Sequence, residues 1–393
     1  MDGKKIKVLR ILNRFNLGGP TFNATFLSAF IGDEFETILV GGVPDEGETD
    51  SLHIVRQYGI EPIVIEEMQR NPNVKSDFLA YKKIKRIIEI EKPDIVHTHA
   101  FKAGLLGRRA AAKLKVPIII HTYHGHVFHS YFNGLKTSIV KGVEKALAKR
   151  STAIVTISDI QKKEIVSDHR ITSDNKAHVI PLGFDLEKFR TDKAAKRKKT
   201  RETFNISEDE VAIAIVGRLA PIKDHDFFLE AIEKIASSSD LKIKVFIVGD
   251  GSERARIAAK AEQINRKFGK IILLTSWILD IASFNQGMDI ICLTSKNEGT
   301  PVSLIEAQAG GLPVVTTDVG GIRDVVQDGV TGFITSKGDI ETYTEKLRLL
   351  VKEDKMRKDF GKRGEAFIFG KFHYSRLVDD MRDLYLKLLD ENK

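Results

Sequence analysis

Two glutamates stand eight positions apart in the segment SKNEGTPVSLIEAQAGGLPVV, residues 295–315. Glu298 lies in a polar, loop-like stretch, and Glu306 lies in the apolar-patterned run from Val302 to Ala309, which predicts a helix. We place Glu306 about two turns into that helix, too far from Glu298 for the adjacent acid pair of a glycosidase. The two carboxylates therefore suit different parts of one elongated ligand.

The start of this predicted helix suits a phosphate. Backbone N–H groups at Thr300 and Val302 lie at the positive end of the helix dipole, whereas Pro301 has no N–H to contribute. Carboxylates beside a phosphate site are natural acceptors for sugar hydroxyls, as the acid-to-ribose contact of dinucleotide sites illustrates. The segment therefore predicts a ligand that carries both groups, and a nucleotide-sugar does.

Two cations, Arg218 and Lys223, follow the β-branched run from Val211 to Val216. At the carboxyl end of a strand they are placed to bind a diphosphate through bidentate and point-charge contacts, although surface salt bridging is the alternative. The string Asp224-His225-Asp226 after them matches the Asp-x-Asp motif of metal-dependent sugar transferases. We favour a helix N-cap for it and expect no metal, because the two cations already supply a metal's charge.

Two further segments follow predicted strands in the first half of the chain. Leu17-Gly18-Gly19-Pro20 leads into a helical pattern from Thr21 to Phe30, so its glycines predict close backbone approach to an anion, unless they form only a tight turn. The loop from His121 to His129 holds four histidines without the spacing of a zinc site. His124 and its neighbours are read as groups that orient a substrate hydroxyl or as loop filler, and the filler alternative extends to His97 and His99.

The elements that position these residues alternate regularly. Short β-branched runs and longer amphipathic segments follow one another in two series, before and after about residue 200, which predicts an α/β protein with two doubly wound, parallel Rossmann-like domains. We predict an N-terminal domain over residues 1–185 and a C-terminal domain over 186–373, with a cleft at the carboxyl ends of both sheets. The amphipathic segment 374–393 is expected to pack back on the first domain.

The first series of predicted strands is Lys7–Leu12, Thr37–Val40, Ile63–Ile65, Ile95–Thr98, Pro117–Thr122, Ala153–Ile157 and His178–Pro181. The second is Val211–Val216, Lys244–Val248, Ile271–Leu274, Ile290–Leu293, Pro313–Thr316 and Gly332–Ile334.

Composition narrows the class of protein. The 393 residues carry a net charge of +8, which favours anionic partners. The single cysteine, Cys292, lies in an apolar run, as expected of a buried, inert thiol, and no apolar run is long enough to span a bilayer. The basic run DKAAKRKKTR at residues 192–201 predicts a solvated surface helix or an interdomain segment, with contact to an anionic membrane as the alternative.

The motifs together resemble the family-four retaining glycosyltransferases of the GT-B fold, which carry a Glu-x7-Glu signature, and the resemblance covers essentially the whole chain. It implies a metal-independent hexosyltransferase without a cofactor that uses a nucleotide-diphosphate sugar, with UDP as the expected nucleotide. The implied catalytic residues are His124, Arg218, Lys223 and Glu298. The implied donor-binding residues are Gly18, Gly19, Arg218, Lys223, Trp277, Ile278, Glu298, Gly299, Thr300, Pro301, Val302 and Glu306.

Within that resemblance each residue has an expected contact. Gly19 approaches the diphosphate, Glu298 holds sugar hydroxyls and Glu306 holds the ribose. The backbone near Trp277 reads the base, although Ser276 and Met288 depart from the family pattern and leave the base open.

The subgroup with the Tyr-His-Gly-His-Val-Phe run builds surface polysaccharides and lipopolysaccharides on lipid-linked acceptors. We therefore expect a cytoplasmic enzyme, peripheral on the membrane through apolar loops near Val127 and Tyr131, that does not bind nucleic acid. The alternatives are a non-hydrolysing nucleotide-sugar 2-epimerase, which needs no acceptor, and a non-catalytic binder of anionic surfaces.

Overall fold

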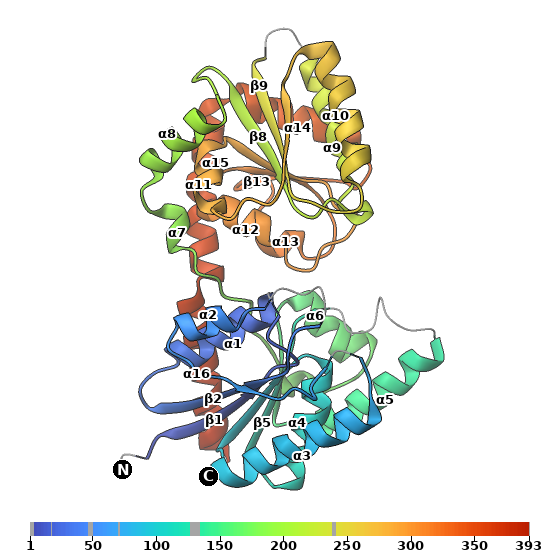
Figure 1. Ribbon diagram of the computed structural model, residues 1–393, viewed down its shortest axis with the longest axis vertical. Helices are drawn as coiled ribbons and strands as arrows, with labels where there is room; N and C mark the ends of the chain where they lie inside the picture. Colours follow the sequence, from blue (N-terminus) through green and yellow to red (C-terminus); the bar gives the residue numbers. More distant parts are fainter. Residues whose placement is uncertain are drawn as a thin grey trace. The chain divides into compact units, whose positions relative to one another are not determined.

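The computed structural model describes residues 4–16, 18–45, 50–69, 71–125, 134–237 and 241–392, with the backbone alone for 134–137. The chain forms two compact units, residues 1–184 with 372–393 and residues 185–371. Each unit is built on one parallel sheet with helices on both of its faces (Figure 1). The doubly wound α/β fold predicted from the alternating pattern is confirmed.

The first unit has seven parallel strands in the order β3-β2-β1-β4-β5-β6-β7. The strands are β1 (Ile6–Ile11), β2 (Phe35–Gly41), β3 (Ile63–Val64), β4 (Ile95–His99), β5 (Ile118–Tyr123), β6 (Ala153–Thr156) and β7 (Ala177–Val179). Its helices are α1 (Gly19–Phe30), α2 (Leu52–Gln57), α3 (Val74–Glu91), α4 (Phe101–Lys113), α5 (Gly134–Arg150), α6 (Asp159–Lys163), a π-helical turn (Glu164–Asp168), a 3₁₀ turn (Asp174–Lys176) and α16 (Tyr374–Glu391).

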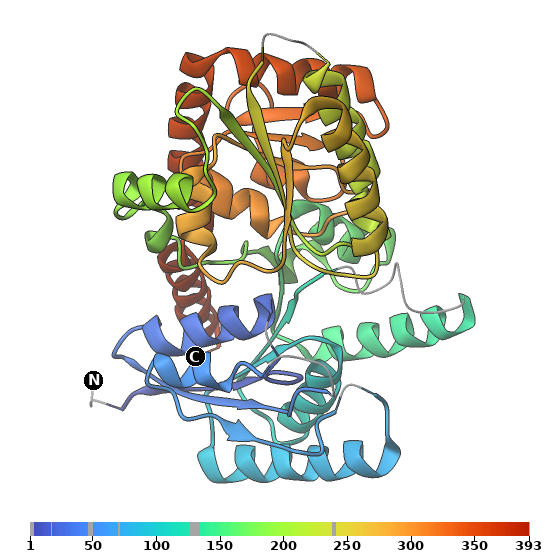
Figure 2. The same cartoon turned by 45° about the horizontal axis from the view of Figure 1, so that its top comes forward.

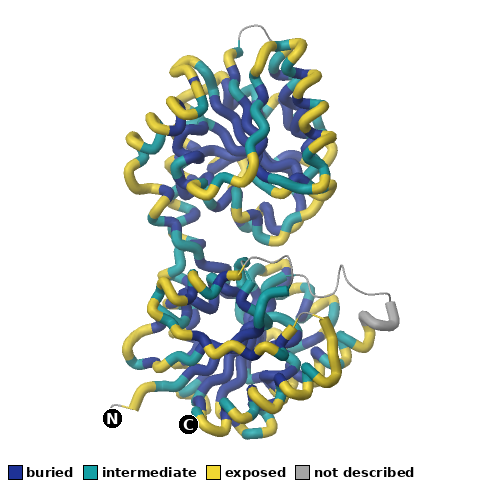
Figure 3. The backbone as a smooth tube through the Cα atoms, in the orientation of Figure 1, coloured by how far each residue is buried: buried dark blue, intermediate teal, exposed yellow. Residues whose placement is uncertain are grey.

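Alternation along the strands gives this sheet two buried faces (Figure 3). Val8, Ile95 and Ile118 are aligned across three strands and pack with α1 and α16, whereas the next residue along each strand packs with α3 and α4. The C-terminal helix α16 lies beside α1 against this sheet (Figures 1 and 2). A strand buried on both faces leaves only its ends for function, so the carboxyl edge is the place to look.

The second unit has six parallel strands in the order β10-β9-β8-β11-β12-β13. The strands are β8 (Val211–Val216), β9 (Ile243–Val248), β10 (Ile272–Thr275), β11 (Ile290–Leu293), β12 (Val314–Thr317) and β13 (Gly332–Thr335). Its helices are α7 (Glu187–Arg190), α8 (Lys193–Thr203), a 3₁₀ turn (Pro221–Lys223), α9 (His225–Ala236), α10 (Arg254–Phe268), α11 (Ile281–Gly287), α12 (Val302–Ala309), α13 (Ile322–Val325), α14 (Ile340–Lys352) and α15 (Asp354–Phe372).

The basic run of residues 192–201 forms most of α8, but it is not simply solvated. Arg197 and Arg201 both bind the Asp289 carboxylate, at 2.8 and 3.2 Å, and the Arg201 side chain is buried. These two ion pairs therefore hold α8 against the segment before β11. Elsewhere in the second unit, Cys292 is buried in β11 as predicted, and burial raises the pKa of its thiol to about 12.

No helix in the part of the chain that the structure describes is both long enough and apolar enough to cross a membrane.

Candidate active site

Lys223 and Glu298 meet at the carboxyl edge of the second sheet. Lys223 ends the 3₁₀ turn that follows β8, and Glu298 lies in the loop between β11 and α12. Lys223 Nζ donates a hydrogen bond to Glu298 Oε1 at 2.5 Å, and Ser295 Oγ donates to the same oxygen at 2.5 Å. Within the described residues, Glu298 Oε2 has no bonding partner. The pair thus leaves one carboxylate oxygen for a ligand.

The loop that carries Glu298 is held from two sides. On one side, the N–H of Lys296 donates to Ile222 O at 2.8 Å, next to Lys223. On the other, the N–H of Gly321 donates to Glu298 O at 3.1 Å, and a Cβ at Gly320 would come within 1.9 Å of that carbonyl oxygen. The close approach therefore requires glycine at this point, and it fixes the Glu298 loop in advance of ligand binding.

Ser295 and the Gly320-Gly321 pair were not predicted from the sequence. For the glycines a signal was present, because paired glycines a few residues after the predicted strand Pro313–Thr316 indicate that another backbone approaches closely.

Arg218 is exposed at the same edge, between β8 and the 3₁₀ turn. Its guanidinium has no ion-pair or hydrogen-bond partner among the residues that the structure describes. Lys223 is thus held in a largely buried ion pair, whereas Arg218 is paired with no described residue. A guanidinium without a protein partner is available to bind an anion in a bidentate manner.

The start of α12 adds unpaired N–H groups to this edge. Pro301 is the N-cap residue, and the N–H groups of Thr300 and Val302 have no protein acceptor in the described chain. Glu306 is the fifth helical residue, so it lies about one turn into α12 and not two as predicted. Burial raises the pKa of its carboxyl to about 7, while the nearby Lys188 partly opposes the shift. Because the described residues offer this carboxyl no hydrogen bond, it is poised to accept one from a ligand.

Trp277 and Ile278 follow β10 at the carboxyl edge too. The Trp277 indole is 55% exposed, and its outer ring lies 3.7 Å from where a Cβ of Gly249 would stand. The N–H and C=O of Ile278 have no backbone partner in the described chain, so they are available to read a planar base. Met288 is fully buried between α11 and β11, at the amino edge of the sheet. Although it departs from the family pattern, its side chain therefore cannot contact the base directly.

Several glycines at the carboxyl edges are not required by the protein's own packing. Among the described residues, no atom lies within 4 Å of a Cβ built at Gly125 or Gly299, and Gly18, Gly19 and Gly217 would make only ordinary contacts. None of the five has a left-handed backbone. These five glycines therefore leave room for a ligand to approach the backbone closely.

The carboxyl edge of the first sheet is lined by histidines. His97 and His99 are in β4 and His121 is in β5, all fully buried, so the reading of His97 and His99 as loop filler is wrong. His124 follows β5, and its Nε2 lies 2.9 Å from His99 Nδ1. Burial lowers the pKa of His124 to about 4, which keeps the imidazole neutral near pH 7.

Other predicted features fall outside this arrangement. His126, His129, Val127 and Tyr131 are not among the described residues. In the described part of the chain, no three His, Cys, Asp or Glu side chains gather closely enough to hold a metal ion.

Both carboxylates of the Asp-x-Asp string bind cations. Asp224 is the N-cap residue of α9, as predicted, but its side chain makes no capping hydrogen bond and pairs with Lys296 at 3.3 Å. Asp226 binds Arg256 and, at 3.5 Å, Lys260.

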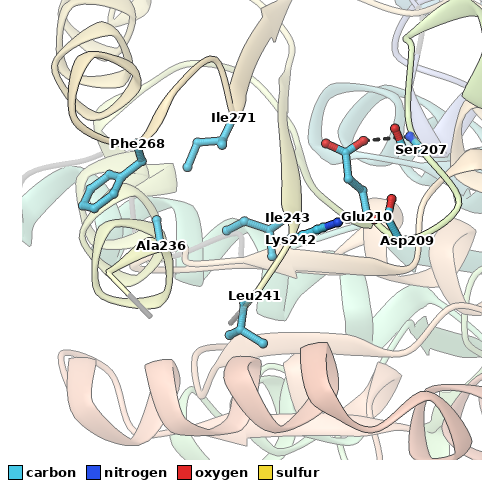
Figure 4. Close-up of a pocket in the computed structure, with 9 residues that line it drawn as sticks. All are labelled: Ser207, Asp209, Glu210, Ala236, Leu241, Lys242, Ile243, Phe268 and Ile271. Atoms are coloured by element: carbon cyan, nitrogen blue, oxygen red, sulfur yellow. Dashed lines mark hydrogen bonds and ion pairs between the residues drawn. The ribbon is translucent and has the colours of Figure 1, made fainter. Parts of the chain in front are cut away.

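A hollow on the second unit lies at the other edge of the sheet. It is lined by residues from the amino ends of β8, β9 and β10, including Glu210, Lys242 and Ile271 (Figure 4). Neither the cations nor the glutamates of the candidate site reach it. The chemistry-bearing residues therefore gather at the carboxyl edge, where open α/β sheets bind ligands.

Comparison with known proteins agrees with this arrangement. Residues 23–188 match the family described as Glycosyltransferase Family 4, and residues 196–367 match the family described as Glycosyl transferases group 1. An Escherichia coli relative, UDP-Gal:alpha-D-GlcNAc-diphosphoundecaprenol alpha-1,3-galactosyltransferase, is 31% identical over 321 residues, 81% of this chain and 82% of the relative. CapM of Staphylococcus aureus, a capsular polysaccharide biosynthesis glycosyltransferase, is 28% identical, over 86% of this chain and 88% of that one.

The chain therefore belongs to the family-four glycosyltransferases, and it is a glycosyltransferase of the GT-B fold. Among solved structures, Anabaena HepE in complex with UDP superposes with a TM-score of 0.80 at 17% identity, covering 97% of this chain and all of that one. A glycosyltransferase of Rickettsia africae superposes with a TM-score of 0.80 at 19% identity, over 98% and 99% of the two chains. These two likenesses support the fold.

Proposed function

We propose that this enzyme transfers a hexose from a UDP-sugar to an acceptor hydroxyl, with retention of anomeric configuration and without a metal ion, during assembly of a polysaccharide or glycolipid. The observation that carries the proposal is the Lys223–Glu298 pair at one sheet edge, where Arg218 is exposed and has no partner within the described part of the chain. The names of the relatives support the substrate class, since one uses UDP-galactose and another acts in capsular polysaccharide biosynthesis. Membership of the transferase family favours transfer over 2-epimerisation of the donor alone.

In this proposal the second unit binds the donor. Arg218, Lys223 and the N–H groups at the start of α12 hold the diphosphate, since an ammonium with three N–H donors binds Glu298 with one and a phosphate with another. Glu298 Oε2 accepts from a sugar hydroxyl, and Glu306 accepts from the ribose. Gly299 and Pro301 shape the loop against the phosphate, and Ile278 and Trp277 contact the base.

The first unit carries the acceptor side and two donor contacts. Gly18 and Gly19 allow the backbone to approach the diphosphate, because a side chain there would fill space that the protein leaves open. His124 is a catalytic residue in this scheme, and its neutral imidazole makes a hydrogen bond near the reacting carbon. A neutral group is appropriate there, because a fixed positive charge would oppose the oxocarbenium character of the sugar in the transition state.

The chemical step needs a stabilised leaving group. The bond from the anomeric carbon to the β-phosphate oxygen breaks, and a bond from the acceptor oxygen forms on the same face of the sugar. The acceptor proton passes to the departing phosphate oxygen. Arg218, Lys223 and the start of α12 stabilise the charge that develops on the diphosphate, and such preorganised groups cost no reorganisation during the reaction.

A lipid-linked acceptor would place the enzyme at the cytoplasmic face of a membrane. On the described part of the first unit, the exposed face of α3 suits this contact, because Val74, Phe78 and Leu79 are 89%, 55% and 47% exposed beside Lys75 and Lys82. Cosedimentation with anionic vesicles at low salt tests it. Phe78→Asp is expected to reduce the bound fraction, and binding that is absent or unchanged by the substitution would exclude this surface.

The activity itself is tested by incubating the purified protein with UDP-hexoses and a sugar-diphosphate-lipid acceptor in EDTA. Transfer should give free UDP and a glycosylated lipid whose new linkage, determined by NMR, keeps the configuration of the donor. Conversion of the donor alone into an isomer would indicate the epimerase instead. A product of inverted configuration would overturn the retaining mechanism, and activity that requires a divalent cation would overturn metal independence.

A further inference from the structure

We propose that Arg254 is a positioning residue that holds residues 276–279, which form the base segment, in the arrangement that binds the nucleobase of the donor. This inference rests on the proposed function, because it names the residue that prepares the base contacts. It starts from Arg254 Nη1, which donates to Gly249 O at 3.2 Å and to Thr275 O at 3.1 Å. Gly249 follows β9 and Thr275 ends β10, and the two strands are neighbours in the sheet. One guanidinium nitrogen therefore joins the ends of both strands at the carboxyl edge.

Few other contacts hold the base segment. The sheet pairing ends at Thr275, opposite Val248. Beyond it, the N–H and C=O groups of Trp277, Ile278 and Leu279 make no hydrogen bond to another residue that the structure describes. Trp277 is 55% exposed, and Leu279 is fully exposed. The position of the base segment therefore depends on contacts at its root, next to Thr275.

The loop that carries Arg218 is held differently. The N–H groups of Gly217 and Leu219, on either side of Arg218, donate to carbonyls of β9 and of the loop after it, at 3.0 and 2.9 Å. These backbone bonds fix the diphosphate side of the site without any side chain. Loss of the Arg254 side chain should therefore disturb the base segment and leave the Arg218 loop in place.

Arg254 lies at the centre of the contacts that reach the base segment. Ser276 Oγ donates to Asp250 Oδ2 at 3.3 Å, and the same carboxylate oxygen lies 3.7 Å from Arg254 Nη1. The hydroxyl by which Ser276 departs from the family pattern thus has a partner in this network. The outer ring of Trp277 lies 3.7 Å from where a Cβ of Gly249 would stand, and Gly249 is a residue whose carbonyl Arg254 binds. Both contacts therefore lead back to Arg254.

A guanidinium suits this role because it is planar, always charged and rich in N–H donors. It orders the base segment before the ligand binds. Without it, binding of the nucleobase has to order the segment, and ordering the backbone of one residue lowers affinity about tenfold. Because the Arg254 side chain is 40% exposed, water can replace its bonds to the two carbonyls, and a substitution should leave the fold intact.

Trp277 is the only tryptophan of the chain, so its fluorescence reports on the base segment without a label. Time-resolved anisotropy measures its nanosecond motion. We expect Arg254→Leu to add a fast decay that the native protein lacks, and Arg254→Lys to resemble the native protein, because an ammonium can still donate to both carbonyls. Arg256→Leu is the matched control, since Arg256 lies in the same helix and binds Asp226 and Glu253 instead. An unchanged decay in Arg254→Leu would overturn the inference.

Calorimetric titration with UDP and with inorganic pyrophosphate, both in EDTA, gives a second readout. Arg254→Leu should bind UDP about tenfold more weakly and pyrophosphate as tightly as the native protein does, because only UDP carries a base. The KM for a UDP-sugar should rise by a similar factor, with kcat unchanged. Equal losses for the two ligands, or none for UDP, would overturn the inference. If the native protein binds neither ligand, the proposed function fails, while the anisotropy still shows whether Arg254 holds the base segment.

Discussion

The carboxyl edges of the two sheets carry opposite kinds of polar group. In the second unit the groups are charged: among the described residues the exposed Arg218 has no partner, and Glu298 keeps one oxygen without a partner. In the first unit they are buried and neutral, and behind them Arg108 binds Glu144 at 2.8 Å, with no exposed surface on either side chain. The same doubly wound fold thus places charged groups at one carboxyl edge and buried, neutral imidazoles at the other.

The difference shows what each kind of charge does in this protein. Removing one partner of a buried ion pair strongly destabilises a protein, because the other charge stays buried without compensation. An exposed charge without a partner contributes little to stability and is free to bind a ligand. Substitutions at the carboxyl edge of the second unit should therefore lower activity, and substitutions at that of the first unit should lower stability.

The largest effect is expected at the Lys223–Glu298 pair. Either Lys223→Ala or Glu298→Ala should lower kcat about 10³-fold, because each removes a preorganised contact to the donor, while the melting temperature changes little. Lys242→Ala is the matched control, since Lys242 pairs with Asp209 at 2.5 Å away from the site and should keep full activity. Near-native turnover in either site variant would remove the pair from the mechanism.

Glu144 provides the opposite case. Glu144→Ala leaves Arg108 buried without its carboxylate and removes the acceptor of the Tyr123 hydroxyl, so the free energy of unfolding should fall by about 3 to 5 kcal/mol. Glu67→Ala, which breaks the largely exposed pair with Lys83, should cost less than about 1 kcal/mol. Urea denaturation measures both. Equal costs for the two variants would contradict the contrast between buried and exposed charge.

Glu306 should give a smaller, pH-dependent effect. With a carboxyl pKa of about 7, it is mostly protonated at pH 6 and ionised at pH 8. An ionised carboxylate accepts hydrogen bonds from two ribose hydroxyls. Because its ionised fraction rises about tenfold between pH 6 and pH 8, a UDP-sugar should bind up to about tenfold more tightly at pH 8. Glu306→Gln should lose this dependence. Calorimetric titration at both pH values measures it, and equal pH profiles for the two proteins would exclude the ribose contact.

The same group makes a prediction for stability. The folded-state pKa of Glu306 lies above its ordinary value of 4.5, so the folded protein holds this proton longer than the unfolded chain does. Its contribution to the free energy of unfolding therefore falls as the pH rises from about 4.5 to about 7, and it is constant above that.

Much of the fold could be read from the sequence, because apolar β-branched runs have clear ends. The strands Val211–Val216 and Ile290–Leu293 have the predicted bounds, and each other predicted strand lies within two residues of an observed one. Parallel strands share one carboxyl edge, so the proximity of Lys223 and Glu298 also follows from their places after β8 and β11.

The buried histidines could not be read in this way. His97 lies within the predicted strand Ile95–Thr98 and His99 is the last residue of β4, but local sequence does not show whether such polar side chains are buried. His97, for example, is covered by α16, whose Tyr385 binds it across 288 positions of sequence. The depth of Glu306 in α12 was misjudged for a different reason, since Pro301 is the N-cap residue and the helix begins only at Val302.

The central claim is that Arg218 and Lys223 hold a nucleoside diphosphate without a metal ion, and calorimetric titration of UDP in EDTA tests it most directly. The native protein should bind UDP under these conditions, and Arg218→Ala should bind it about 10- to 100-fold more weakly with an unchanged melting temperature in the absence of ligand. Arg323→Ala is the control, because Arg323 pairs with the exposed Asp318. Binding that Arg218→Ala leaves intact, or that requires a divalent cation, would contradict the account.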